Sequence, residues 1–97
     1  YREDHLLTAR KSYYRCKQQV MEHYCNGGVR CALCHFTNPK ALSIDHIDGK
    51  GADHRREIKG INLYRWLVKN DFPDGFQVLC MNCQWVKRYD ELGFSEV

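Results

Sequence analysis

The sequence predicts a small α+β domain that follows a long basic N-terminal helix, and three observations lead to this fold class. First, 97 residues are the length of one domain. Second, two Cys-x-x-Cys pairs lie far apart and are able to cross-link a domain whose core is small for its surface. Third, helical and strand-like patterns alternate, and no repeat or linker divides the chain. We expect the basic helix in residues 1–28 and the cysteine-bearing domain in residues 29–97.

Residues 3–25 are expected to form the N-terminal helix. Apolar residues recur there at steps of three and four and make one stripe, which consists of Leu6, Ala9, Tyr13, Cys16, Val20 and Tyr24. The sequence Asn26-Gly27-Gly28 follows and ends the helix, because glycine tolerates the left-handed conformation that a helix C-terminus needs.

Shorter patterns indicate the remaining elements. Residues 41–47 alternate as a strand, with Leu42, Ile44 and His46 on one face. Residues 53–60 are charged and are expected to be a loop or a ragged helix. Asn62 is able to cap a helix that runs to about residue 69. A turn at residues 72–75, a second strand at residues 76–79 and a helix over residues 82–92 complete the domain.

The charge is uneven along the chain. Residues 1–40 carry seven basic residues against three acidic ones, whereas residues 41–97 carry eight against nine. A basic N-terminal segment suits a polyanionic partner such as nucleic acid. A solvated helix face is the alternative interpretation. The candidate nucleic-acid contacts in this segment lie largely off the apolar stripe and are Arg10, Lys11, Arg15 and Lys17.

Four of the six cysteines form the pairs Cys31/Cys34 and Cys80/Cys83. Thiolates are soft ligands that favour zinc, and four of them satisfy its tetrahedral preference. Each Cys-x-x-Cys turn places two sulfurs on one side of an ion, so the two turns together predict one structural Zn²⁺ site. A redox pair or unrelated buried thiols are the alternative. Among the remaining donors, Cys16 and Cys25 are expected to pack without binding metal, and His35 is a less favoured substitute ligand.

The cysteine spacing argues against the disulfide framework of a secreted domain. The sequence contains neither the apolar region of a signal peptide nor a run long enough to cross a bilayer. We therefore expect reduced thiols, a cytoplasmic location and no membrane partner. The oligomeric state stays open.

Two stretches carry a resemblance to a known family. One is Ser43-Ile44-Asp45-His46-Ile47-Asp48-Gly49, and the other is Leu79-Cys80-Met81-Asn82-Cys83-Gln84-Trp85-Val86-Lys87-Arg88. A strand bearing Asp-His, a second strand and then a helix resemble the ββα-metal, or His-Me, finger of HNH endonucleases. The resemblance covers about residues 29–90. It implies a zinc-stabilised ββα-metal domain that hydrolyses phosphodiester bonds in DNA with Mg²⁺ or Mn²⁺.

The resemblance implies a role for each site residue. His46 would be the general base that activates water, a role that suits imidazole because it titrates near neutral pH. Asp45 and Gln84 would hold the divalent cation, which stabilises charge on the scissile phosphate and the leaving oxygen. Asp45 and His46 are neighbours, and the side chains of neighbours leave opposite faces of an ideal strand. We therefore expect a bend or bulge at this point, which Asp48-Gly49 is able to provide.

Two positions depart from the family pattern. The residue after the last zinc cysteine is usually His or Asn, but here it is Gln84. The middle Asn of the HNH name maps near Gly75, where the sequence has no Asn. These departures support a second hypothesis, in which the chain is a catalytically impaired HNH-fold module that binds DNA or RNA, for instance as a ribonucleoprotein subunit. A zinc-stapled protein-interaction module is a third interpretation, but it leaves the Asp-His strand unexplained.

Further basic residues surround the expected site. Arginine offers phosphate a planar fork and lysine a point charge. The candidate contacts in this region, each of which is otherwise a solvated surface residue, are His54, Arg55, Arg56, Lys87 and Arg88. For His54, the functional interpretation is a metal or phosphate contact and the alternative is an exposed loop histidine. Trp66 and Trp85 fall in helical apolar patterns and are expected in the core.

Overall fold

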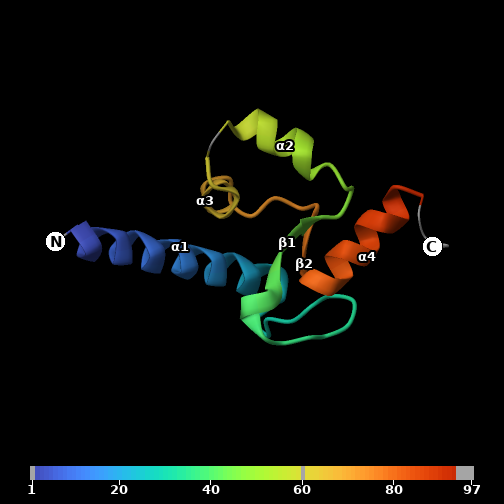
Figure 1. The fold of residues 1–97 in the computed structure, drawn as a ribbon, viewed down its shortest axis with the longest axis horizontal. Coiled ribbons are helices and arrows are strands. Elements are labelled where there is room, and N and C mark those ends of the chain that lie inside the picture. The colour runs from blue at the N-terminus through green and yellow to red at the C-terminus, as the bar shows by residue number, and fades with distance from the viewer. Residues whose placement is uncertain (1, 60, 94–97) are drawn as a thin grey trace.

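The computed structural model describes residues 2–59 and 61–93, and for residues 2–7 it describes the backbone alone. These residues form a small α+β structure, as the sequence predicts, and its two strands pair in an antiparallel sheet (Figure 1). In chain order the elements are α1 (Arg2–Tyr24), η1 (Pro39–Ala41), β1 (Leu42–His46), α2 (Gly51–Ile58), α3 (Leu63–Lys69), β2 (Phe76–Cys80) and α4 (Met81–Glu91). The parts of the expected domains that fall on residues 1, 60 and 94–97 lie outside the described residues.

Helix α1 packs through its C-terminal part, whereas its N-terminal part extends away from the sheet (Figure 1). Val20 and Met21 are buried, and the partly buried residues beside them are Tyr13, Cys16 and Tyr24. This part of the predicted stripe is therefore confirmed. Ala9 is exposed, and the side chain of Leu6 lies outside the described residues. Neither α1 nor any other described helix has the length and apolarity that a membrane span requires.

The turn after α1 ends the helix as expected, but asparagine rather than glycine takes the first left-handed position. Asn26 has a φ of 55°, and Gly27 follows with a φ of 106°. The N–H of Gly27 donates to the carbonyl of Glu22 (2.9 Å), and the N–H of Asn26 donates to that of His23 (3.3 Å). These two bonds form a Schellman motif, which satisfies carbonyl groups that the helix itself leaves unpaired.

Strands β1 and β2 pair in a regular antiparallel register over all five residues of each strand. Leu42 and Ile44 are buried, as the alternation predicts. The register runs through Asp45 and His46 without interruption, so the expected bend or bulge between these two residues is wrong. Their side chains consequently leave opposite faces of the sheet. Asp45 meets α4, and His46 meets α2.

Residues 51–58 form helix α2, although the sequence favours a loop or a ragged helix over residues 53–60. Tertiary contacts account for the difference. Ile58 is buried, and the ring of His54 packs edge-on against Trp66. The helix ends at Lys59, which has a left-handed φ of 44°. His54 is therefore a partly buried helical residue, and the alternative of an exposed loop histidine is wrong.

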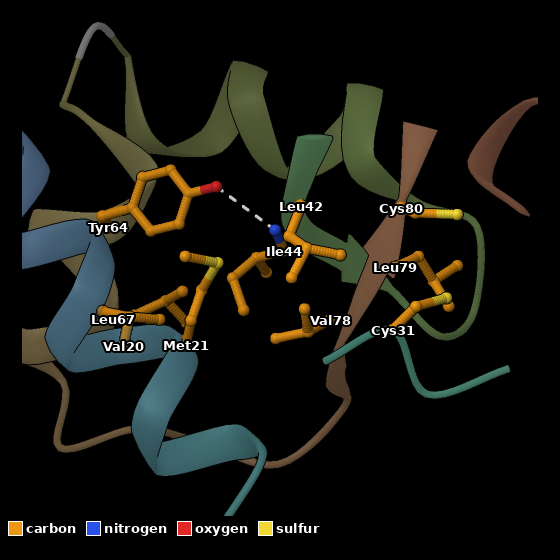
Figure 2. Packing of buried hydrophobic residues seen from close by; sticks show 10 residues of the cluster. All are labelled: Val20, Met21, Cys31, Leu42, Ile44, Tyr64, Leu67, Val78, Leu79 and Cys80. Carbon is orange, nitrogen blue, oxygen red and sulfur yellow. Dashed lines mark hydrogen bonds between the residues drawn. The ribbon is translucent and has the colours of Figure 1, made fainter. Parts of the chain in front are cut away.

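Helix α3 begins at the predicted cap. The side-chain oxygen of Asn62 accepts the backbone N–H groups of Tyr64 (2.9 Å) and Arg65 (3.4 Å). The hydroxyl oxygen of Tyr64 in turn accepts the backbone N–H of Ile44 in β1 (3.2 Å; Figure 2). This bond satisfies a buried donor on the outer edge of the sheet. Burial raises the pKa of Tyr64, so its hydroxyl stays neutral in this contact.

One hydrophobic core joins α1, α3, the sheet and Cys31 of the first cysteine pair. Figure 2 shows that it extends from Val20 and Leu67 at one end to Cys31 and Cys80 at the other. The cysteine cluster is thus continuous with the apolar interior. A cross-link at this place would add stability to a domain that is too small to bury a large core.

Helix α4 presents an apolar face to solvent. Trp85 is 54% exposed, so its expected place in the core is wrong. Tyr89 and Leu92 follow it at helical spacing and are also exposed. Trp66, by contrast, packs against the core, as predicted. A stripe at helical spacing looks the same in sequence whether it faces the interior or the solvent.

Candidate metal centre and adjoining groove

The sulfur atoms of Cys31, Cys34, Cys80 and Cys83 gather at one point, as the sequence predicts. All four Sγ atoms lie within 4.8 Å of one another. A tetrahedral zinc site with Zn–S bonds of about 2.3 Å places its sulfurs about 3.8 Å apart. The cluster therefore has both the donor atoms and the spacing of a structural metal site.

Backbone hydrogen bonds shape the first Cys-x-x-Cys turn and attach it to the sheet. The N–H of His35 donates to the carbonyl of Cys31 (3.0 Å), and the N–H of Cys31 donates to that of Phe36 (2.9 Å). His35 closes the turn with a left-handed φ of 66°. The N–H of Ala32 donates to the carbonyl of Val78 in β2 (2.8 Å), which continues the hydrogen bonding beyond β2.

The second pair lies at the junction of β2 and α4. Cys80 is the last residue of β2 and the N-cap of α4, and its sulfur accepts the N–H of Cys83 (3.4 Å). One residue thus ends the strand, begins the helix and offers a sulfur, so a metal bound here holds α4 against the sheet.

The pKa values of Cys31 and Cys83 are shifted in opposite directions. Burial raises the pKa of Cys31, but the backbone N–H groups of Cys34, Cys80 and Leu33 outweigh this effect and lower the pKa to about 6. Burial and the neighbouring sulfurs raise the pKa of Cys83 to about 12. One thiolate therefore forms readily, whereas further thiolates crowd against it. A divalent cation bound among the four sulfurs would offset the repulsion between neighbouring thiolates.

The other sequence-predicted donors lie outside the cluster. Cys16 packs against the core, as expected for a small apolar residue. The thiol of Cys25 donates to the carbonyl of Arg30 (3.4 Å), a local contact that the sequence does not reveal. His35 is exposed and is not among the described residues that can share a metal. The alternative ligand set that includes His35 is therefore not the one that the structure brings together.

A groove of about 560 Å³ runs between the end of β1, the β1–α2 loop and α4. It is lined by all three residues to which the sequence assigns catalysis, which are Asp45, His46 and Gln84. Gly49 lies in the loop with a φ of 75°, and a side chain there would come within 2.8 Å of Glu91 on α4. The carboxylate of Glu91 is the end of a flexible side chain and is able to move, so the left-handed φ is what favours glycine at this position.

Asp45 is held by two donors on the α4 side of the sheet. Its Oδ2 accepts the amide of Gln77 (3.0 Å) and the ammonium of Lys87 (2.9 Å). The same ammonium contacts Oε1 of Glu91 (3.0 Å) and the carbonyl of His46 (2.8 Å). Burial lowers the pKa of Lys87, but its bonds to Asp45 and Glu91 outweigh burial and raise that pKa. Lys87 therefore connects α4 to β1 through an ion pair and a hydrogen bond.

Gln84 faces the strand from the first turns of α4. Its Nε2 donates to the hydroxyl of Ser43 and to the carbonyl of Leu79 (3.0 Å). Both bonds use the amide nitrogen rather than the oxygen that a metal ion would require. The structure thus brings Gln84 and Asp45 to the same groove and gives each of them protein partners.

His46 lies on the other face of the sheet, where its Nε2 is 2.8 Å from Nδ1 of His54. Its ring also packs edge-on against Phe76, with centroids 4.8 Å apart. Burial, and next the charge of His54, lower the pKa of His46. The imidazole is therefore neutral near pH 7, which is the form that a general base needs.

The candidate phosphate contacts fall into two groups. Arg55, Lys87 and Arg88 line the groove, whereas Arg56 forms an exposed ion pair with Asp53 (3.0 Å). The predicted contacts of the first helix are not among the groove-lining residues. Three of them are exposed along α1, namely Arg10, Lys11 and Arg15.

Lys17 differs from its neighbours on α1. Its ammonium lies over the ring of Tyr64, 5.8 Å from the ring centroid, and burial lowers its pKa. The basic part of α1 projects away from the sheet (Figure 1). The two sets of basic residues are therefore separate surfaces in this structure.

Sequence reasoning missed several residues of the groove. Glu91 stands four residues after Lys87, a spacing typical of a helical ion pair, and this signal was available. Trp85 gave no usable signal, because its helical stripe predicts a buried face equally well. No family model matches the chain, and neither a curated protein nor a solved structure matches it.

Proposed function

We propose that the chain is an HNH-type, metal-dependent endonuclease that hydrolyses phosphodiester bonds in DNA. One observation carries the proposal. Asp45, His46 and Gln84 line a single groove where a two-stranded sheet meets a helix, next to a cluster of four thiols. The order of two paired strands followed by a helix supports the resemblance to the ββα-metal finger.

Zinc is the proposed occupant of the cysteine cluster. Four sulfur donors at tetrahedral spacing suit Zn²⁺ and fill its coordination shell, so the ion would be structural rather than catalytic. In this role it connects the turn after α1 to the start of α4.

The donors in the groove also fit a second, hard cation. The carboxylate of Asp45 and the amide oxygen of Gln84 are oxygen ligands of the kind that Mg²⁺ and Mn²⁺ prefer. A carboxylate has lone pairs beyond the two that Gln77 and Lys87 use. When bound, such a cation supplies charge stabilisation at the scissile phosphate and the leaving oxygen.

The chain's own residues then account for the proton transfer and the orientation. His46 takes a proton from water as the water oxygen forms a bond to phosphorus, and the bond from phosphorus to the leaving deoxyribose oxygen breaks. That oxygen leaves with the electron pair and gains a proton from solvent. Arg55 and Arg88 line the same groove and would orient the phosphate through charge-assisted hydrogen bonds. The basic surface of α1 would hold a more distant part of the duplex.

Plasmid nicking tests the proposal. The zinc-loaded chain should convert supercoiled plasmid to the nicked form with Mg²⁺ or Mn²⁺, and His46→Ala should lower the rate by a factor of about 100 or more. His23→Ala is the matched control, because His23 stacks on Phe72 and does not line the groove. A wild-type chain that leaves DNA intact with every divalent cation tried would end the proposal, and so would full activity of His46→Ala.

A second candidate function has a specific observation in its favour. The ammonium of Lys87 already sits on Asp45, and the amide nitrogen of Gln84 is engaged by Ser43 and Leu79. These contacts suit a nucleic-acid-binding module that has lost catalysis. For such a module, the chain would shift DNA or RNA in a gel without cleaving it, and His46→Ala would bind as well as the wild type.

A further inference from the structure

The pair His46 and His54 is an arrangement that the proposed function does not use. Nε2 of His46 and Nδ1 of His54 are 2.8 Å apart, which is the length of a strong hydrogen bond. The two residues come from the end of β1 and from α2, so the fold rather than the local sequence brings them together.

Aromatic rings surround the second imidazole. His54 packs edge-on against Trp66 with centroids 4.2 Å apart, and it lies 5.9 Å from Phe76. Its Nε2 is buried and has no hydrogen-bond partner among the described residues. Nε2 of His54 has no polar partner among these residues whether it carries a proton or not. The positions of the protons therefore depend on the contact between Nδ1 of His54 and Nε2 of His46.

Only one proton fits between the two facing nitrogens of a neutral pair. With that proton on Nε2 of His46, Nδ1 of His46 keeps its lone pair. This Nδ1 faces Gly51, a groove-lining residue at which a side chain would come within 3.2 Å of the nitrogen. The proton of His54 then lies on its Nε2, among the rings, where an N–H to aromatic contact compensates in part.

The same hydrogen bond responds to proton uptake. When Nδ1 of His46 gains a proton, the ring becomes a cation, and its Nε2–H bond to His54 becomes charge-assisted and stronger. An orienting acceptor of this kind fixes the tautomer of a general base and stabilises the cation that forms. Carboxylates usually supply it, but a neutral imidazole nitrogen provides the same lone pair.

We propose that His54 is a positioning residue that accepts the Nε2 proton of His46 and thereby directs the basic Nδ1 of His46 into the groove. This inference rests on the proposed function for its catalytic consequence. The hydrogen bond itself is independent of activity, and the experiment is designed around that difference.

The first measurement is nitrogen-15 NMR of the histidine rings in the full, zinc-loaded chain at about pH 8. We expect a proton on Nε2 of His46 and a coupling across the hydrogen bond to an unprotonated Nδ1 of His54. A proton found on Nδ1 of His54 would overturn the inference, and so would the absence of any coupling between the two rings.

The second measurement compares two variants of His54 in plasmid nicking. His54→Leu keeps a similar volume but removes the acceptor, so kcat should fall by a factor of about 10 to 100 while KM stays unchanged. His54→Asn places an amide oxygen near the position of Nδ1 and should restore most of this loss. His23→Leu, which removes a histidine outside the groove, should leave kcat unchanged.

The two measurements separate the possible failures. Wild-type kcat in His54→Leu, or equal loss in His54→Asn and His54→Leu, would contradict a positioning role. If the wild-type chain cleaves nothing, the proposed endonuclease function fails. The NMR result still decides whether His54 sets the tautomer of His46.

Discussion

Lys87 connects three parts of the groove through one ammonium group. Its partners are a carboxylate on β1, a carboxylate on α4 and a backbone carbonyl at the end of β1. The side chains of Lys87 and Asp45 are only 19% and 17% exposed, so water screens their attraction poorly. Lys87 therefore stabilises the packing of α4 on the sheet as well as the charge of the groove.

We predict that Lys87→Met lowers the free energy of unfolding by about 1–3 kcal/mol, because it leaves Asp45 without its charged partner. Urea unfolding of the zinc-loaded chain measures this change. Because the pKa of Lys87 is raised in the folded chain, its contribution to stability is present at neutral pH. This contribution disappears only as pH rises through that pKa. Arg56→Met is the control, since its exposed ion pair should contribute less than about 0.5 kcal/mol. Equal effects of the two substitutions on the free energy of unfolding would contradict a stabilising role for the ion pair between Lys87 and Asp45.

The role of a residue could be predicted from the sequence where the residue type and its spacing from other residues determine that role. The four cysteines and the cap at Asn62 were predicted because a metal shell and a helix N-terminus each demand particular donors. The partner of His46 was not, because His54 reaches it through tertiary packing on Trp66. The contacts of Gln84 to Ser43 and Leu79 were hidden for the same reason.

At the scale of elements, Tyr24 connects the C-terminal end of α1 to the turn that precedes β2. Its hydroxyl donates to the carbonyl of Pro73, in the turn that leads into β2. Burial, and next the charge of Asp74, raise the pKa of Tyr24 to about 12. The hydroxyl therefore keeps its proton, and its hydrogen bond, over the ordinary pH range.

We predict that Tyr24→Phe lowers the free energy of unfolding at neutral pH by about 0.5–1.5 kcal/mol, which is the worth of one hydrogen bond. It should also change the alkaline behaviour. In the wild type, the unfolded tyrosine ionises near pH 10 and the folded one near 12, so stability falls as pH rises across this window. Tyr24→Phe should show a shallower fall, whereas Tyr14→Phe, at an exposed tyrosine, should behave as the wild type. Parallel pH curves for wild type and Tyr24→Phe would disprove this role.

The elements were predicted best where a long pattern or a fixed cap defines them. α1, β1, α3, β2 and α4 lie within a few residues of the predicted bounds. The sequence predicts only a loop or a ragged helix at α2, because the stabilising contacts of this helix come from Ile58 and from the packing of His54 on Trp66, and neither contact produces a periodic apolar pattern. The expected strand bend is wrong because the register continues to His46 and the chain turns only after it, at Gly49, whose φ is 75° and whose N–H donates to the carbonyl of His46.

At the scale of the whole molecule, the cysteine cluster connects segments that are distant in the sequence. The turn after α1 and the junction of β2 with α4 meet there, and the core reaches the cluster at Cys31 and Cys80 (Figure 2). The groove lies between the sheet and the helix that starts at this junction. If a metal ion holds the four sulfurs, the same ion maintains the groove in which Asp45 and His46 lie.

The most direct measurement is an amide NMR spectrum of the full chain before and after zinc is removed with a chelator. We expect dispersed signals with one zinc ion per chain, collapse of the dispersion on chelation, and recovery when one equivalent of Zn²⁺ is returned. Cys31→Ser should prevent the recovery, whereas Cys16→Ser, outside the cluster, should allow it. A spectrum that stays dispersed after all zinc has been removed, with the groove signals of Asp45, His46 and Gln84 unchanged, would contradict the dependence of the groove on the metal.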